Sequence, residues 1–153
     1  MSSAPVRRQI TVEVPQQRAF EFFTGRMESW WNPDHQIGGK PFESLVIEPH
    51  VGGRWFERDA EGAEEQWGSV LAWEPHDRVL LAWQLDATWR YDPDFVTELE
   101  IRFVPEGERA TRVELEHRGM ERYGDAVDDI QGQFDGGGGW QDLLDRFARG
   151  LGV

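Results

Sequence analysis

Apolar and polar side chains alternate along two neighbouring segments in the second half of the chain. Residues 97–103 carry threonine or an apolar side chain at every second position, with glutamate or arginine between them. Residues 110–117 repeat this pattern and bring His117 onto the apolar face. A period of two with one apolar face is typical of antiparallel strands that bury one face. Pro105 and Gly107 lie between the two segments and predict a hairpin.

Shorter runs of the same kind predict further strands upstream. Proline, glycine or acidic residues bound each run, and these residue types are typical of turns. The predicted strands are residues 6–14, 42–48, 54–58, 66–74, 78–85, 95–104 and 110–117. Since no strand–helix–strand repetition occurs, a parallel doubly wound sheet is disfavoured. We therefore expect an α+β fold with an antiparallel sheet of six or seven strands.

Helical spacing of apolar residues predicts helices at both ends of the chain. Pro15 suits a first helical turn, and Gly25 is the expected end of that helix. A short second helix is expected at residues 27–31. The last helix, residues 139–151, has the longest apolar stripe, which places it against the sheet. The stripe consists of Trp140, Leu143, Leu144, Phe147, Ala148 and Leu151.

The segment before the last helix is acidic and rich in glycine. Residues 123–139 are expected to form a long loop or a partly helical lid, with glycines 136–139 as a hinge. Its aspartates do not match a calcium-binding EF-hand loop, so a solvated acidic segment is the better interpretation. The four histidines are scattered along the sequence without the spacing of metal ligands. Neither a metal nor a cofactor is expected.

Composition narrows the classes of partner. The chain has 153 residues, which we interpret as one domain over residues 1–153, and it contains no cysteine. A net charge of −13 disfavours binding to nucleic acid and to anionic lipid surfaces. No long apolar run and no secretory signal are apparent, so no membrane insertion and a cytoplasmic location are expected. A homodimer is left open.

Several short motifs, taken in order, resemble a known family. They are Val14-Pro15, Trp30-Trp31, Gly52-Gly53-Arg54-Trp55, Gly68-Ser69-Val70 and Gly139-Trp140. Their order and spacing resemble the SRPBCC or START-like superfamily of the birch-pollen allergen. Within it, they are most similar to the group named after the activator of heat-shock-protein-90 ATPase homologues. The resemblance spans residues 6–151 and implies a helix-grip fold, in which a curved sheet wraps around the long C-terminal helix with a ligand cavity between them.

Strand parity and this resemblance give candidate ligand-binding residues. Trp83 shares a strand face with Val79 and Leu81, and Trp140 begins the stripe of the last helix, so both are expected to point inward. Inward parity also selects Thr97 and His117. Residues near strand or loop ends, where the resemblance places a pocket mouth, are Trp31, Trp67, Trp89 and Phe95. The alternative for each is plain core packing, and for His117 it is a hydrogen-bonded histidine at a strand end.

Three functions remain open from the sequence. The first is a carrier or sensor that binds a small hydrophobic molecule. The second is a cyclase- or dehydratase-type enzyme that uses the same cavity, with His117 or a nearby carboxylate moving protons. The third is a co-chaperone-like protein interaction domain, as in the co-chaperone members of the family that the chain resembles. The first requires only a pocket, whereas the second requires at least two polar groups that converge in it.

Overall fold

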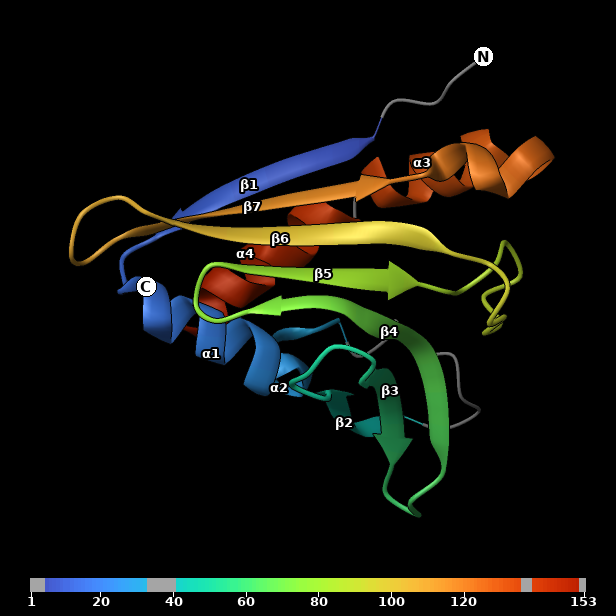
Figure 1. Cartoon of the computed structure of the whole chain (residues 1–153), viewed down its shortest axis with the longest axis horizontal. Helices are drawn as coiled ribbons and strands as arrows, with labels where there is room; N and C mark the ends of the chain where they lie inside the picture. The colour runs from blue at the N-terminus through green and yellow to red at the C-terminus, as the bar shows by residue number, and fades with distance from the viewer. Residues whose placement is uncertain (1–4, 33–40, 136–138, 152–153) are drawn as a thin grey trace.

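Seven antiparallel strands form one sheet, in the order β1-β7-β6-β5-β4-β3-β2 (Figure 1). The computed structural model describes residues 5–32, 41–135 and 139–151. The strands are β1 (Val6–Val12), β2 (Phe42–Ile47), β3 (Arg54–Asp59), β4 (Glu64–Glu74), β5 (Arg78–Trp83), β6 (Thr97–Pro105) and β7 (Thr111–Arg118). Strands β2 to β7 pair in chain order, and β1 pairs with β7. The predicted antiparallel sheet is confirmed.

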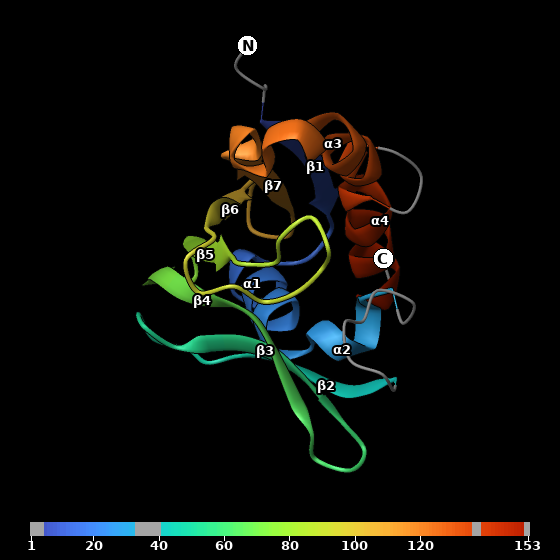
Figure 2. The same ribbon diagram turned by 90° about the vertical axis from the view of Figure 1, so that its right-hand side faces the viewer.

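Helices cover the concave side of this sheet. They are α1 (Gln16–Gly25), α2 (Met27–Trp30), the 3₁₀ helix η1 (Met120–Ala126), α3 (Val127–Asp135) and α4 (Trp140–Gly150). Figure 2 shows the sheet curling, with α2 and α4 on its open side. The two short helices after the first strand and the helix-grip arrangement are therefore confirmed.

The apolar stripe of α4 lies in the core. Trp140, Leu143, Leu144 and Phe147 are all buried. The helix packs against β1 and α2, and the ring centroid of Phe147 lies 5.3 Å from that of Phe23 on α1. The longest helical apolar stripe in the sequence thus closes the curled sheet.

The two faces of the sheet separate as the alternation predicts. Along β7, every second residue from Thr111 to His117 is buried, and the residues between them are half-buried. The half-buried set carries charge, with Arg118 paired to Glu116 on the outer face. One face therefore supplies the core and the other holds ion pairs between neighbouring strands.

Several strand boundaries differ from the sequence prediction. At two of them the backbone bonds to a side chain or within a turn instead of to the backbone of a neighbouring strand. The first strand ends at Val12, and the Thr111 hydroxyl donates to the carbonyl of Val14 beyond it. The sixth strand begins at Thr97, because Phe95 bonds through its backbone N–H to Asp92 in a turn.

For the acidic segment the sequence left open a long loop or a partly helical lid. The structure shows helix, with η1 and α3 extending to Asp135. Gly38, Gly39 and Pro41 also predict a loop over residues 35–41, but this segment lies outside the described residues except for residue 41. The hinge expected at 136–139 lies outside them except for Gly139.

Candidate ligand-binding site

Aromatic rings from six segments surround Trp83 in the interior. Trp83 is the last residue of β5, and its side chain is buried. The rings whose centroids lie 5.3–6.4 Å from its own are Trp55, Trp67, Trp89, His117, Phe134 and Trp140. All six contacts are T-shaped, the arrangement that aromatic quadrupoles favour. We call these seven rings the aromatic cluster.

A chain of hydrogen bonds crosses the cluster between α4 and the sheet. The indole Nε1–H of Trp140 donates to Nδ1 of His117 over 3.1 Å. Nδ1 therefore carries no proton in the neutral ring, and Nε2–H donates to Oγ1 of Thr97 over 2.8 Å. The Thr97 hydroxyl in turn donates to the carbonyl of Trp83 over 3.2 Å. Each donor in this chain has a matching acceptor.

Burial controls the charge of His117. Its side chain is fully buried, and this desolvation lowers the pKa of His117 from 6.5 to about 3. The ring is therefore neutral near pH 7, as the bond from Trp140 requires. With both ring nitrogens engaged, this conformation matches the alternative of a hydrogen-bonded histidine at a strand end.

Tyr123 of η1 extends the hydrogen-bonded region toward the end of β5. The Nε1–H of Trp83 donates to the Tyr123 hydroxyl over 3.0 Å, and that hydroxyl donates to the carbonyl of Leu85 over 2.9 Å. Burial raises the pKa of Tyr123, so the phenol stays protonated and can donate. Phe95 packs on this tyrosine, with ring centroids 4.9 Å apart. Phe95 therefore lies one layer outside the aromatic cluster.

A second polar contact lies among the rings of β3, β4 and α2. The ring centroid of Trp31, the residue after α2, lies 5.3 Å from that of Trp67 and 5.9 Å from that of Trp140. Trp67 also contacts Trp55, at 5.4 Å. The Nε1–H of Trp67 donates over 2.9 Å to Oε1 of Glu57, a carboxylate that is only 2% exposed. The interior thus holds a buried carboxylate beside its tryptophans.

Trp89 lies at the outer limit of the cluster, in the loop between β5 and β6. Its side chain is 36% exposed, and its ring centroid is 6.1 Å from that of Phe134 on α3. Its backbone φ of 61° is in the left-handed region, which is uncommon for a residue other than glycine. The turn is built on Asp86, whose Oδ1 accepts the backbone N–H groups of Thr88 and Arg90. This turn holds Trp89 against the rings.

The structure brings most of the predicted site residues together. Those that are buried around the aromatic interior are Trp31, Trp67, Trp83, Thr97, His117 and Trp140. Trp89 joins them from the half-exposed loop, and Phe95 contacts them only through Tyr123.

Sequence reasoning missed four side chains of this region: Trp55, Glu57, Tyr123 and Phe134. Trp55 and Glu57 alternate within the predicted strand 54–58, so parity could have placed them on one face. No periodic signal marks Tyr123 or Phe134, since their segment is acidic and rich in glycine.

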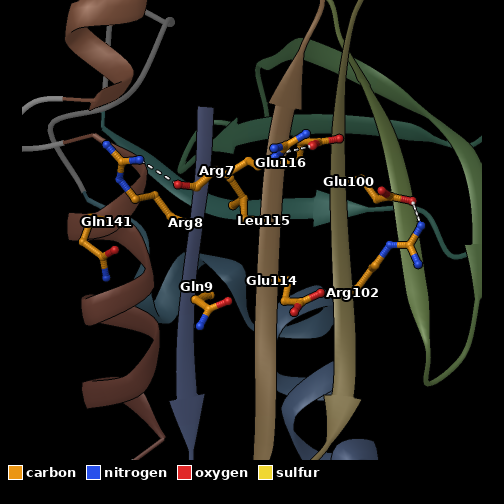
Figure 3. A pocket seen from close by; sticks show the side chains of 9 residues that line it. All are labelled: Arg7, Arg8, Gln9, Glu100, Arg102, Glu114, Leu115, Glu116 and Gln141. Atoms are coloured by element: carbon orange, nitrogen blue, oxygen red, sulfur yellow. Dashed lines mark hydrogen bonds and ion pairs between the residues drawn. The ribbon is translucent and has the colours of Figure 1, made fainter. Parts of the chain in front are cut away.

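The outer face of the sheet carries a separate hollow of about 620 Å³ (Figure 3). Charged side chains of β1, β6 and β7 line most of it, including Arg7, Arg102 and Glu114. It reaches Gln141 of α4 around the edge of β1. Its charged lining distinguishes this hollow from the aromatic interior.

Among the described residues, no group of three histidine, cysteine or acidic side chains is placed to hold a metal ion. Nor does any of their helices have the length and apolar character needed to cross a membrane.

Comparison with known proteins shows relatives of similar length and fold. The anthrahydroquino-γ-pyrone synthase Txn09, complexed with SUM, is 38% identical over 97% of both chains, with a TM-score of 0.68. CalC from Micromonospora echinospora, described as a self-sacrificing resistance protein, is 29% identical. The match covers 95% of this chain and 92% of CalC, with a TM-score of 0.71.

Protein MLL2253 from Mesorhizobium loti shares the fold, with a TM-score of 0.70 at 18% identity and 97% coverage of both chains. A search of curated proteins found no match. The sequence profile of the Activator of Hsp90 ATPase homolog 1-like proteins matches residues 13–152. The chain therefore belongs to this family, within the SRPBCC-type fold.

Proposed function

We propose that this protein binds a planar, polycyclic aromatic small molecule between the sheet and α4, among the rings of the aromatic cluster. The observation that carries the proposal is the set of six rings around Trp83. Ring faces and edges bind other aromatic systems by the same offset and edge-to-face contacts that they make with one another. The similarity to a synthase of an anthrahydroquinone-derived product supports a ligand with several fused rings.

Entry to the interior passes Trp89 in this proposal. The cluster rings already contact one another, so a ligand must displace some of them. Trp89 is the most exposed member of the cluster, and it contacts Trp83 at the end of β5 and Phe134 of α3. Its left-handed backbone conformation is the kind of local strain that often accompanies a functional loop.

A titration with 2,6-dihydroxyanthraquinone, followed by tryptophan fluorescence, tests this function. The wild-type protein should bind, and Trp89→Leu should weaken binding by roughly 5- to 10-fold, because it removes aromatic contact at a half-exposed position. Trp73→Leu is the matched control, since this half-buried tryptophan contacts Phe20 instead of the cluster. Circular dichroism verifies that each variant folds. Absence of wild-type binding up to the solubility limit of the probe would contradict the proposal.

A ring-closing enzyme is the second candidate, favoured by the 38% identity to a synthase over 97% of both chains. An interior that excludes water and holds a flexible chain near a ring would lower the entropic barrier to cyclisation. The direct test is to incubate the protein with an anthrahydroquinone that carries an unsaturated ketone side chain. Addition of a phenolic oxygen to that side chain forms one C–O bond and moves one proton from oxygen to carbon. The product therefore has unchanged mass and separates by chromatography.

A further inference from the structure

Trp55 of β3 has a buried hydrogen-bond donor that packing does not use. Its side chain is completely buried, and its indole Nε1 has no hydrogen-bond partner among the described residues. Buried polar atoms in folded proteins are nearly always hydrogen-bonded, because an unpaired donor keeps its full desolvation cost. Trp55 packs against Trp67 and Trp83, so this donor belongs to the aromatic interior.

Glu57 places a hydrogen-bond acceptor on the same face of the same strand. Residues two apart in a strand point to one side of the sheet, and both Trp55 and Glu57 are buried. Oε1 of Glu57 accepts from Nε1 of Trp67. The two oxygens of a carboxylate can together accept about four hydrogen bonds, so a carboxylate with one or two partners in the protein can still accept from a ligand hydroxyl group.

Trp30 provides an internal comparison. Its Nε1 is also buried without a hydrogen-bond partner among the described residues. Its ring, however, packs against Phe23 and Phe147 of the helical layer, at centroid distances of 4.8 and 5.4 Å. Among the described residues, only Trp55 combines such a donor with direct contact to Trp83 and with a buried carboxylate on the same face of its strand.

We propose that Trp55 and Glu57 form the polar end of the ligand site and select hydroxylated quinones among planar aromatic molecules. The Trp55 indole N–H donates to a carbonyl oxygen of the ligand, and the Glu57 carboxylate accepts from a ligand hydroxyl group. This inference rests on the proposed binding function and adds the ligand class. The rings supply contact area for any flat molecule. These two groups favour, in addition, a molecule with oxygen atoms at its edge, because they form hydrogen bonds with them.

Three probes with one ring skeleton separate these contributions: anthracene, 9,10-anthraquinone and 2,6-dihydroxyanthraquinone. Trp55→Phe keeps a buried ring but removes the donor. It should weaken anthraquinone binding roughly 5-fold more than it weakens anthracene binding, because the difference between the two probes is the value of one hydrogen bond. Glu57→Gln should weaken dihydroxyanthraquinone binding roughly tenfold or more relative to its effect on anthraquinone binding, because it removes a charge-assisted bond to the ligand hydroxyl group.

Matched controls test whether these losses are specific. Trp30→Phe removes an equally buried indole donor outside the cluster, and Glu65→Gln removes an exposed carboxylate of β4 that pairs in register with Glu57. Neither change should alter the ranking of the three probes. In addition, the Trp55 indole N–H signal of the wild-type protein, assigned as the signal lost in Trp55→Phe, should move downfield with anthraquinone, as a new hydrogen bond requires, and should not move downfield with anthracene.

The outcomes distinguish this inference from the function on which it rests. If the wild-type protein binds none of the three probes, the proposed function fails. If it binds all three with equal affinity, or if the Trp55 signal does not move with anthraquinone, only the role of Trp55 and Glu57 is overturned. Loss of probe ranking in Trp30→Phe would likewise overturn it.

Discussion

His117 combines complete burial with hydrogen bonds at both ring nitrogens. Because of this combination, the stability of the folded protein depends on whether the ring is charged. The ring accepts from Trp140 and donates to Thr97, so it links α4 to β6 and β7. A second proton on the ring would replace the acceptor at Nδ1 with a donor facing the indole N–H. The folded state therefore excludes the charged form, while the unfolded chain does not.

The consequence is a loss of stability in mild acid. The pKa of His117 falls from 6.5 to about 3 on folding, so the unfolded chain takes up a proton that the folded protein rejects. Stability is retained above pH 6.5 and lost as the pH falls below it, by about 2 kcal/mol between pH 7 and pH 5. Urea denaturation at several pH values should show this slope in the wild-type protein and a shallower one in His117→Gln. Equal slopes would mean that His117 is charged or exposed in the folded state.

At the scale of elements, Gly139 determines how α4 begins. A Cβ atom at this position would lie 2.1 Å from the carbonyl oxygen of Phe134, a backbone atom that cannot rotate away. Absence of a side chain therefore lets the end of α3 approach the start of α4. This approach stacks the Phe134 ring on Trp140, with centroids 5.6 Å apart and planes inclined by 19°.

Gly139→Ala should accordingly lower the free energy of unfolding by about 1–3 kcal/mol, the usual range for a forced backbone shift. Near-ultraviolet circular dichroism should change as well, because the stack of Phe134 on Trp140 would be disturbed. Gly132→Ala is the matched control, since a Cβ there meets nothing within 4 Å and alanine favours the interior of α3. A Gly139→Ala variant as stable as the control would show that the two helices can separate freely.

Elements with strong periodicity were predictable, and those held by distant contacts were not. The alternation around Leu115 and the stripe of α4 placed strands and helix on the correct faces. The segment of Tyr123 and Phe134 has no such period. Its helices are held by contacts far away in sequence, such as the bond between Tyr123 and the carbonyl of Leu85, and local patterns contain no information about these.

Convergence of the site follows from the curl of the whole sheet. Parity along a strand shows that Trp83 and Trp55 each point inward. It does not show that β3 and β5 bring their ring centroids to 5.6 Å from each other. The sequence also contained the alternation of Trp55 and Glu57, and nothing in it marked their hydrogen-bonding states. Whether Trp55 and Glu57 are hydrogen-bonded depends on which side chains lie next to them in the interior, and those neighbours come together only in the folded protein.

The opposite face of the sheet is held together by charge across four strands. Arg118 of β7 bonds to glutamates of β6 and β7, and one of these is Glu100 of β6. Arg78 of β5 also bonds to Glu100. Arg7 of β1 pairs with Glu116. Isolated surface pairs contribute little to stability, whereas a network around a largely buried charge contributes more. Glu100 is that charge, at 7% exposure.

Glu100 should therefore contribute to the acid stability of the whole molecule. Burial alone would raise its pKa, but hydrogen bonds from Arg78, Arg102 and Arg118 outweigh burial and lower the pKa from 4.5 to about 2. A depressed carboxyl pKa stabilises the fold above the unfolded value of 4.5, and the benefit disappears as the pH falls from there toward 2. The His117 effect begins at higher pH, below 6.5, so between pH 6.5 and 4.5 the loss of stability comes from His117, and below pH 4.5 both groups contribute.

Glu100→Gln should lower the free energy of unfolding by about 2 kcal/mol at pH 7, and the difference from wild type should shrink below pH 4.5. Glu98→Gln is the control on the same strand. Its side chain is 45% exposed and bonds to Arg118, so a loss below about 1 kcal/mol is expected. Urea denaturation at pH 7, 5 and 4 measures both variants. Equal losses, or a Glu100→Gln loss that is the same at all three pH values, would show that the stability of the network does not depend on this buried charge.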